Sequence, residues 1–208
     1  MIRAYKYRLY PTQVQIEHLT RILDIHRWVY NDALTERTEA WKMCRQSVSY
    51  YDQAMQLKAI RRFDPDVAWC NFTSLQQTLR RLNKAFGTFF RRVKQGLDKP
   101  GYPKYKSRKT FRSVSYVYND GIRLKNGRLY VQNVGEIRIF KHRPLPVGAT
   151  VKQAVIMRDK GWDWYVVFQV EAPTDTPHLV PGPAVGLDVG LESFIALSTG
   201  EWVDNPRW

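Results

Sequence analysis

One long stretch with helical periodicity, residues 12–95, interrupts a chain that otherwise carries β-strand patterns. Ahead of it, apolar side chains alternate with charged or polar ones over residues 2–10, as in a strand with one buried face. Behind it, short alternating segments separated by tight turns begin near residue 113. Strand patterns on both sides of the helical stretch indicate that the helices are inserted between strands of one sheet.

Start and stop signals divide the helical stretch into separate helices. Two pairs, Thr12 with Gln15 and Ser49 with Asp52, each fit a capping box, in which the paired side chains satisfy free backbone N–H groups. Gly96 is a natural stop for the last helix. The apolar faces predicted to pack in the core extend to Trp41 in the first helix and to Val93 in the last helix, and the helix between them runs through Met55, Leu57 and Ile60.

Tight turns mark the strands of the second part. Asn126–Gly127 is the strongest two-residue hairpin signal, and Asp159–Gly161 joins two further alternating segments. About six short antiparallel strands, with the N-terminal strand as one more, suggest a small barrel. The predicted fold class is therefore α+β, an antiparallel β-barrel with an inserted helical bundle. The predicted domains are the barrel (1–10 and 96–172), the helical insertion (11–95), a proline-rich linker (173–183) and a last segment (184–208).

Positive charge with interleaved tyrosines points to nucleic acid. The chain has 33 Lys and Arg against 19 Asp and Glu, a formal net charge of +14. Nine of these cations lie in residues 91–112, where Asp98 is the single acid. Cations neutralise phosphates, and aromatic faces stack on bases. A solvated basic loop without a partner is the alternative, but so many like charges would repel one another with nothing to bind.

The polar face of the last predicted helix offers two side chains suited to DNA. Gln76 has the donor and acceptor for a bidentate contact with adenine, and Arg80 has the donors to read guanine or to grip a phosphate. An ordinary solvated helix face is the alternative, and a single glutamine does not exclude it.

One acid in an apolar run, Asp188, is a candidate metal ligand. It lies within Val185–Gly190, a pattern expected of a buried strand, where a carboxylate needs a partner, a proton or a cation. Metal-assisted phosphodiester cleavage uses several such carboxylates. An ordinary hairpin with a locally hydrogen-bonded aspartate is the alternative. Further ligands would have to come from Glu192, Glu201 and Asp204.

The sequence favours a cytoplasmic setting. No stretch is long and apolar enough to span a bilayer, and the first residues lack the apolar core of a secretory signal. Cys44 and Cys70 have no metal-binding spacing and are expected to be reduced thiols. Nucleic acid, with no membrane, is therefore the expected partner.

The order of these parts resembles the TnpB family, insertion-sequence-encoded proteins that are similar to the ancestors of type V CRISPR effectors. The resemblance covers the whole chain, and the motifs are specific in combination although each is weak alone. The motifs are Tyr7–Thr12, Trp28–Asn31, Ser74–Arg80, Ala85–Arg91, Gly101–Arg108 and Val185–Gly190.

The resemblance implies an RNA-guided, metal-dependent DNA endonuclease, in which the barrel is a wedge domain and the helical insertion a recognition lobe. Such a protein binds a guide RNA made from the transposon end and reads a short motif beside double-stranded target DNA. The resemblance also implies a cytoplasmic, nucleoid-associated location in a prokaryote. It makes Asp188 a catalytic residue and Mg²⁺ ligand, the first acid of an RNase H-like (RuvC) domain whose first strands lie in residues 184–208. The implied DNA-contacting residues are Tyr50, Gln76, Arg80, Ser113 and Ser115. The implied RNA-contacting residues are Lys104, Tyr105, Lys106, Arg108 and Lys109.

The family's later catalytic acids and its zinc ribbon have no counterpart in these 208 residues, so we expect the chain to be unable to cleave DNA alone. Two other functions stay open at this point. One is a nuclease-dead, RNA-guided repressor, and the other is a guide-independent, transposase-like protein that uses its helices in the DNA major groove. The guide sequence, the target-adjacent motif and the oligomeric state also stay open.

Overall fold

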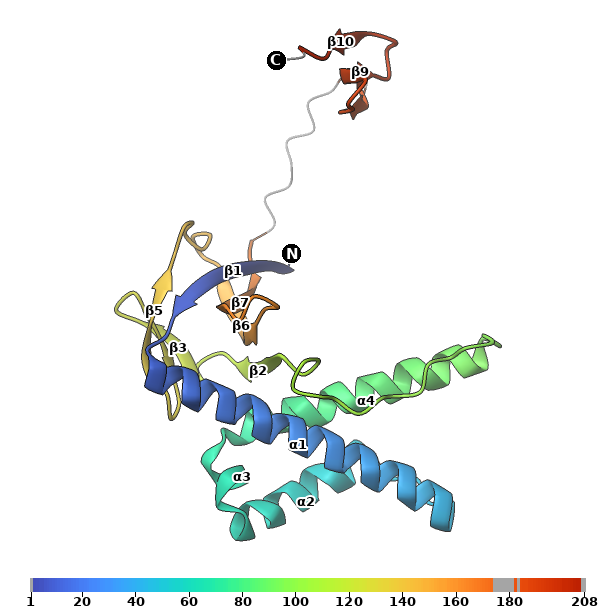
Figure 1. Cartoon of the computed structure of the whole chain (residues 1–208), viewed down its shortest axis with the longest axis vertical. Helices are drawn as coiled ribbons and strands as arrows, with labels where there is room; N and C mark the ends of the chain where they lie inside the picture. The colour runs from blue at the N-terminus through green and yellow to red at the C-terminus, as the bar shows by residue number, and fades with distance from the viewer. Residues whose placement is uncertain (1, 174–181, 183, 207–208) are drawn as a thin grey trace. The chain divides into compact units, whose positions relative to one another are not determined.

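The computed structural model describes residues 2–173, 182 and 184–206, and the chain divides into two compact units, Met1–Pro173 and Thr174–Trp208. In the described part of the first unit, one strand leads into four helices, and six strands follow (Figure 1). The helices are α1 (Gln13–Cys44), α2 (Tyr50–Phe63), α3 (Pro65–Trp69) and α4 (Phe72–Lys94). The strands are β1 (Ile2–Tyr10), β2 (Ser113–Val117), β3 (Ile122–Lys125), β4 (Arg128–Val131), β5 (Gly135–Phe140), β6 (Thr150–Arg158) and β7 (Trp164–Glu171). The predicted linker, residues 173–183, lies almost entirely outside the described residues.

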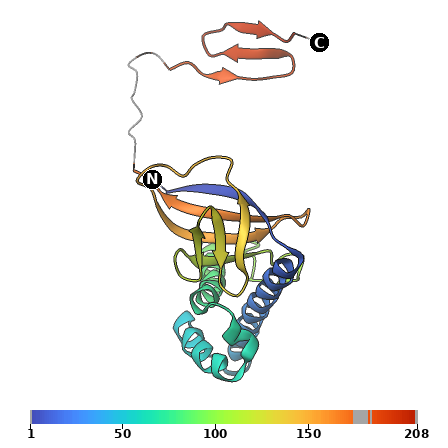
Figure 2. The ribbon, with the colours of Figure 1, turned by 90° about the vertical axis from the view of Figure 1, so that its left-hand side faces the viewer.

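The seven strands form one antiparallel sheet that curls into a nearly closed barrel (Figure 2). Their order is β2-β6-β7-β1-β5-β4-β3, so β1 lies in the middle of the sheet, between β7 and β5. The two edge strands, β2 and β3, are neighbours in the sequence and are joined by a tight turn. In that turn the Asn119 N–H donates to the Ile122 carbonyl (2.8 Å). The prediction of an antiparallel barrel that includes the N-terminal strand is confirmed.

Alternation in the sequence becomes alternation of burial in the barrel. Tyr5, Tyr7 and Leu9 of β1 are buried, while the residues between them face solvent. The predicted hairpin at Asn126–Gly127 also forms, and both residues have positive φ (49° and 73°), as a type I′ turn requires. The barrel interior and the helices share one continuous cluster of buried apolar side chains.

Both predicted capping boxes are present, and one of them also ties the helices to the barrel. The Gln15 N–H donates to the Thr12 hydroxyl (3.4 Å), and the Thr12 N–H donates to the Gln15 side-chain oxygen (3.0 Å). The Gln15 side-chain amide in turn donates to the Glu136 carbonyl of β5 (3.0 Å). The start of α1 is therefore fixed to the barrel. No helix in the described part of the chain is long and apolar enough to cross a membrane.

The start of α4 is joined to the barrel through Asn71. Its side-chain oxygen accepts the Ser74 N–H (2.8 Å), and its amide donates to Asp120 (3.0 Å) and Gln132 (3.1 Å) beyond β2 and β4. Gly121 leaves the room for this contact, since a Cβ there would lie 2.7 Å from the Asn71 amide nitrogen and its φ is +76°. The first turn of α4 therefore has a fixed position on the barrel.

The predicted apolar faces are wrong at their outer ends. Gln53 of α2 donates to the Ala33 carbonyl (2.8 Å) and to Glu36 (2.7 Å), so α2 packs on the middle of α1 and the last turns of α1 extend beyond it. Side chains there have no neighbouring element to cover them. The exposed residues predicted to be in the core are Trp41 and Val93.

The second unit contains a three-stranded antiparallel sheet of order β10-β9-β8. Its strands are β8 (Leu187–Asp188), β9 (Ser193–Leu197) and β10 (Trp202–Asp204). The hairpins predicted here are present, but the prediction of a buried strand is wrong, because Leu187 and Asp188 are both exposed. Strands of two to five residues in one sheet cannot cover their own faces.

Candidate nucleic-acid interface

The basic segment between α4 and β2, residues 96–112, is held on α1 and is called the docked loop below. The Lys106 N–H donates to the Asn31 side-chain oxygen (2.8 Å), and the Asn31 amide donates to the Lys106 carbonyl (3.0 Å). This reciprocal pair uses only the backbone of Lys106. The path of the loop is therefore fixed while its cationic side chains stay free for a partner.

Two tyrosines fasten the docked loop further along α1. The hydroxyls of Tyr105 and Tyr102 lie 3.2 Å from those of Thr35 and Thr38, respectively. Tyr102 also packs edge-on against Phe89 of α4, with ring centroids 5.1 Å apart. Tyr102 thus anchors the loop, whereas the Tyr105 ring is 59% exposed and remains open to stacking.

The cations of the docked loop face solvent. Lys104, Arg108 and Lys109 are exposed, and Lys106 is half-buried with its ammonium 5.9 Å from the Tyr30 ring centroid. The Arg108 Nε lies 3.0 Å from the Asp24 carboxylate. An ion pair with so exposed an arginine contributes little, so Arg108 remains available to a phosphate. The stretch from Lys104 to Lys109 thus presents four positive charges at preset positions.

A second surface surrounds α4. The Arg80 Nε donates to the Tyr50 hydroxyl of α2 (3.1 Å), and the guanidinium lies 5.5 Å from the Tyr50 ring centroid. The terminal N–H groups of Arg80 stay free for acceptors on a partner. Gln76 lies one turn earlier on the same face of α4 and is half-buried. The structure therefore brings Tyr50 and Arg80 together, with Gln76 beside them along the helix.

Arg81 links this surface to strand β2. Its Nη1 donates to the Ser113 carbonyl (3.2 Å) and to the Ser113 hydroxyl (3.4 Å). Ser115 lies on the same face of β2, because side chains alternate along a strand. Burial lowers the pKa of the Arg81 guanidinium, which also packs 5.0 Å from the Phe111 ring centroid. Arg81 was not among the residues predicted from the sequence, since its neighbour Arg80 has the more regular spacing.

Asp188 lies exposed on β8, opposite Ala196 of β9. Asp204 is on β10, at the other side of β9, while Glu192 and Glu201 lie outside the strands. Within the described residues, no group of three His, Cys, Asp or Glu side chains is placed to hold a metal ion. Carboxylates suit Mg²⁺, but phosphodiester cleavage needs several of them at one point. The described residues therefore do not by themselves fit a Mg²⁺ site.

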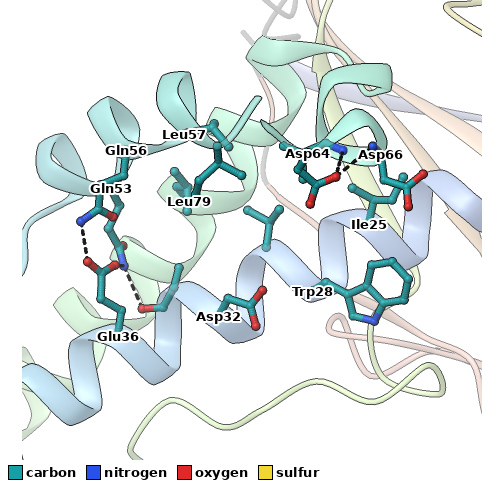
Figure 3. A pocket seen from close by; sticks show the side chains of 14 residues that line it. Ile25, Trp28, Asp32, Glu36, Gln53, Gln56, Leu57, Asp64, Asp66 and Leu79 are labelled. Atoms are coloured by element: carbon teal, nitrogen blue, oxygen red, sulfur yellow. Dashed lines mark hydrogen bonds between the residues drawn. The ribbon is translucent and has the colours of Figure 1, made fainter. Parts of the chain in front are cut away.

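A pocket of about 400 Å³ between α1, α2 and α3 has the opposite charge to the docked loop (Figure 3). Glu36 accepts hydrogen bonds there from Gln53 and Gln56, and Asp64 accepts the Asp66 N–H. Carboxylates repel phosphates, so this pocket is not suited to nucleic acid. Its lining includes no Lys or Arg and four acids, Asp32, Glu36, Asp64 and Asp66.

The barrel with its inserted helices, the docked loop and the polar surface of α4 define a class of basic protein suited to binding nucleic acid. Residues 1–46 match the family model of a helix-turn-helix domain from the OrfB proteins of IS605-type elements. A candidate RNA-guided DNA endonuclease of Streptomyces pristinaespiralis is 37% identical over 209 residues, 99% of this chain and 50% of that protein. The candidate RNA-guided DNA endonuclease InsQ of Escherichia coli K12 is 27% identical over 212 residues, 96% of this chain and 48% of that protein. The chain is a TnpB-family sequence and corresponds to the N-terminal portion of that family.

The chain spans about half the length of the curated relatives that it matches. A chain in a cryo-EM structure of a Cas12f1–sgRNA–target DNA complex matches with a TM-score of 0.48 and 10% identity, over 95% of this chain and 54% of that chain. The name of the family model does not describe the geometry of residues 1–46. The elements within that range are one strand, β1, and one continuous helix of 32 residues, α1.

Proposed function

We propose that this chain is the part of a transposon-encoded RNA-guided DNA endonuclease that binds the guide RNA and the target DNA. The observation that carries the proposal is the docked loop, in which Lys104, Arg108 and Lys109 are exposed while the backbone is fixed by Asn31. A loop that is already fixed loses little conformational entropy on binding. More of the electrostatic attraction between its cations and the phosphates therefore remains as binding free energy. The names of the curated relatives support the same function.

The docked loop is the proposed RNA-binding surface. Single-stranded or A-form RNA is recognised through its phosphates and by stacking on exposed aromatic rings. The loop offers both, since the exposed Tyr105 ring lies between Lys104 and Lys106 in the sequence. The acidic pocket on another face of α1 repels phosphate, which favours binding on the loop face.

The α4 surface is the proposed reader of a short motif in double-stranded DNA. Gln76 and Arg80 are one helical turn apart, which is the spacing needed to address neighbouring base pairs from one helix face. The Tyr50 hydroxyl holds Arg80 in place, and Ser113 and Ser115 flank the surface from β2. Base pairing with the guide reads the remaining target sequence.

The Gln76→Ala variant is expected to lose base preference at one position of the target-adjacent motif. A bidentate contact contributes about 1–3 kcal/mol of discrimination, or roughly 5- to 160-fold between the preferred base and the others. Binding of the purified RNA complex to a DNA library randomised beside the target measures this preference. Gln77→Ala, the adjacent half-buried glutamine on α4, is the matched control. An unchanged preference in the Gln76 variant, or an equal change in the control, contradicts the assignment.

Nucleic acid that co-purifies with the chain from its host tests the function as a whole. Sequencing of this material is expected to return a discrete RNA from the transposon end. Recovery of DNA alone contradicts the proposal and supports a guide-independent DNA-binding protein.

We also propose that the chain alone is catalytically incomplete, because Asp188 has no converging acids among the described residues. Incubation of the same complex with Mg²⁺ and a matching plasmid is expected to leave the plasmid uncut, and a Mg²⁺-dependent cut contradicts that part.

A further inference from the structure

A basic groove lies where the β6–β7 hairpin meets α1 and the end of the docked loop. The sequence patterns predict only the turn of that hairpin. Its volume is about 550 Å³. The Arg158 N–H donates to the Arg112 carbonyl (2.9 Å), so the hairpin and the loop end form one continuous wall. The groove is lined on the cationic side by Arg108, Lys109, Arg112, Arg158 and Lys160.

The groove is lined by five Lys and Arg side chains and by only two acids, so its net charge is positive. The two acids in the lining are both engaged, since Asp24 pairs with Arg108 (3.0 Å) and with Arg27 (3.2 Å), and Asp159 accepts the Asp163 N–H (3.0 Å). Burial lowers the pKa of the Arg158 guanidinium, the Asp24 carboxylate raises it in part, and the neighbouring cations Arg112 and Arg108 lower it. A bound anion relieves this repulsion, so the groove is complementary to phosphate.

Trp162 lies at the mouth of the groove in an unusual conformation. Its φ is +69°, in the left-handed region that a bulky side chain rarely adopts, and its side chain is 70% exposed. The Arg158 guanidinium lies 4.3 Å from the indole ring centroid. Strained backbone of this kind persists at ligand sites more often than elsewhere. An exposed indole beside guanidinium groups is the arrangement that stacks a base and holds its phosphate.

We propose that this groove binds one nucleotide of a single-stranded nucleic acid, with its base on Trp162 and its phosphates among Arg112, Arg158 and Lys160. The volume is in the range of pockets that enclose one small molecule, and a base pair in a duplex cannot enter it. Arg108 and Lys109 belong to both the docked loop and the groove, so a strand that follows the loop reaches the groove next. The identification of the bound nucleic acid as the guide RNA rests on the proposed function. The nucleotide site itself does not depend on that function.

The Trp162→Asn variant tests the site. The chain already uses asparagine at positive φ at Asn119, Asn126 and Asn133, so this change removes the ring without adding backbone strain. Affinity for a fluorescein-labelled single strand of about 12 nucleotides is expected to fall roughly 5- to 100-fold, as for the loss of one stacked base. An oligouridine probe and an oligo(dT) probe show whether the site prefers RNA or DNA. Binding of a duplex of the same length is expected to change less than twofold.

Matched control variants distinguish the loss of base stacking from a loss of the fold and from a general loss of positive charge. Trp41→Ala removes another exposed tryptophan that has an arginine over its ring (Arg45, 5.8 Å) and is expected to leave single-strand affinity unchanged. Lys160→Ala is expected to lower the salt slope of binding by about 0.7, and Lys58→Ala on α2 lowers it less. Thermal unfolding of each variant confirms that the fold is retained.

Three outcomes overturn the inference. They are unchanged single-strand affinity in the Trp162 variant, an equal loss for the duplex, and an equal loss in the Trp41 control. If the fourfold docked-loop variant described below loses RNA binding while the Trp162 variant does not, the groove proposal fails and the proposed function stands. If the unaltered chain binds oligo(dT) through Trp162 but binds no RNA, the proposed function fails and the groove proposal stands.

Discussion

A chain whose docked loop has lost four cations is expected to bind RNA at least about 100-fold more weakly at about 0.1 M salt. Each phosphate contact with a single strand contributes about 0.7 to the slope of log affinity against log salt, so four contacts contribute about 3. At about 0.1 M salt this electrostatic term corresponds to two to three orders of magnitude in affinity. The changes, combined in one chain, are Lys104→Ala, Lys106→Ala, Arg108→Ala and Lys109→Ala.

The variant is expected to fold normally, which makes the comparison clean. Asn31 bonds to the backbone of Lys106, and this pair survives when the side chain is shortened. Fluorescence anisotropy at several salt concentrations measures both the affinity and the slope. A charge-matched control replaces four cations elsewhere on the first unit, namely Lys42, Lys58, Arg62 and Lys141. An unchanged affinity and slope in the loop variant, or an equal loss in the control, contradicts the assignment of the loop.

The second large effect expected concerns stability in mild acid and depends on His26. This side chain is fully buried between α1 and α4, where its Nδ1 lies 2.8 Å from the Ile22 carbonyl and its Nε2 lies 2.9 Å from the Ser74 hydroxyl. Burial lowers the pKa of His26 from 6.5 to about 4. The imidazole is therefore neutral in the folded chain at pH 7 and resists protonation until well below the pKa that it has when unfolded.

The sign of the effect follows from proton binding by the two states. Above pH 6.5 the ring is neutral in both states, and His26 gives the free energy of unfolding no pH dependence. Between pH 6.5 and about 4 the unfolded chain binds a proton that the folded chain does not, so stability falls as pH falls. A fall of the His26 pKa from 6.5 to about 4 corresponds to a loss of about 3 kcal/mol across this window.

Urea unfolding at a series of pH values measures this loss. In the His26→Gln variant the stability at pH 7 is expected to be lower, but the fall between pH 6.5 and 4 is expected to be about 3 kcal/mol smaller than in the unaltered chain. His142→Gln, at an exposed histidine, is the control and is expected to keep the full fall. An equal fall in both variants, or an NMR titration of His26 with a pKa near 6.5, contradicts the prediction.

The local parts of the fold were predictable because their signals lie a few residues apart. The capping pair Thr12–Gln15 determines where α1 begins, and Asn126–Gly127 determines a hairpin turn. Neither signal depends on contacts with distant parts of the chain. The strand expected over residues 2–10 is found at Ile2–Tyr10, and the second series of strands, expected to begin near residue 113, begins at Ser113. The barrel itself followed from the number and shortness of these strands.

Contacts between distant segments were not predictable in this way. Asn31 and Lys106 are 75 residues apart, and nothing in the helical pattern distinguishes Asn31 from any solvent-facing asparagine. The hairpin signal at residues 159–161 predicts a turn but not the groove that it faces, so Arg158 and Trp162 were passed over. The burial expected for Asp188 depends on a second layer of structure, which a single strand pattern does not specify.

The position of β1 determines when the first unit can be completed during synthesis. Of the seven strands of the barrel, β1 is synthesised before the others, and both of its neighbours in the sheet come much later, since β5 begins at Gly135 and β7 at Trp164. The four helices emerge in between, and each has its own start signal in the local sequence. The nascent chain therefore carries Tyr5, Tyr7 and Leu9 without their partner strands until β5 and β7 have been synthesised. The barrel can close around β1 only after β7, the last of its strands in the sequence, has been synthesised.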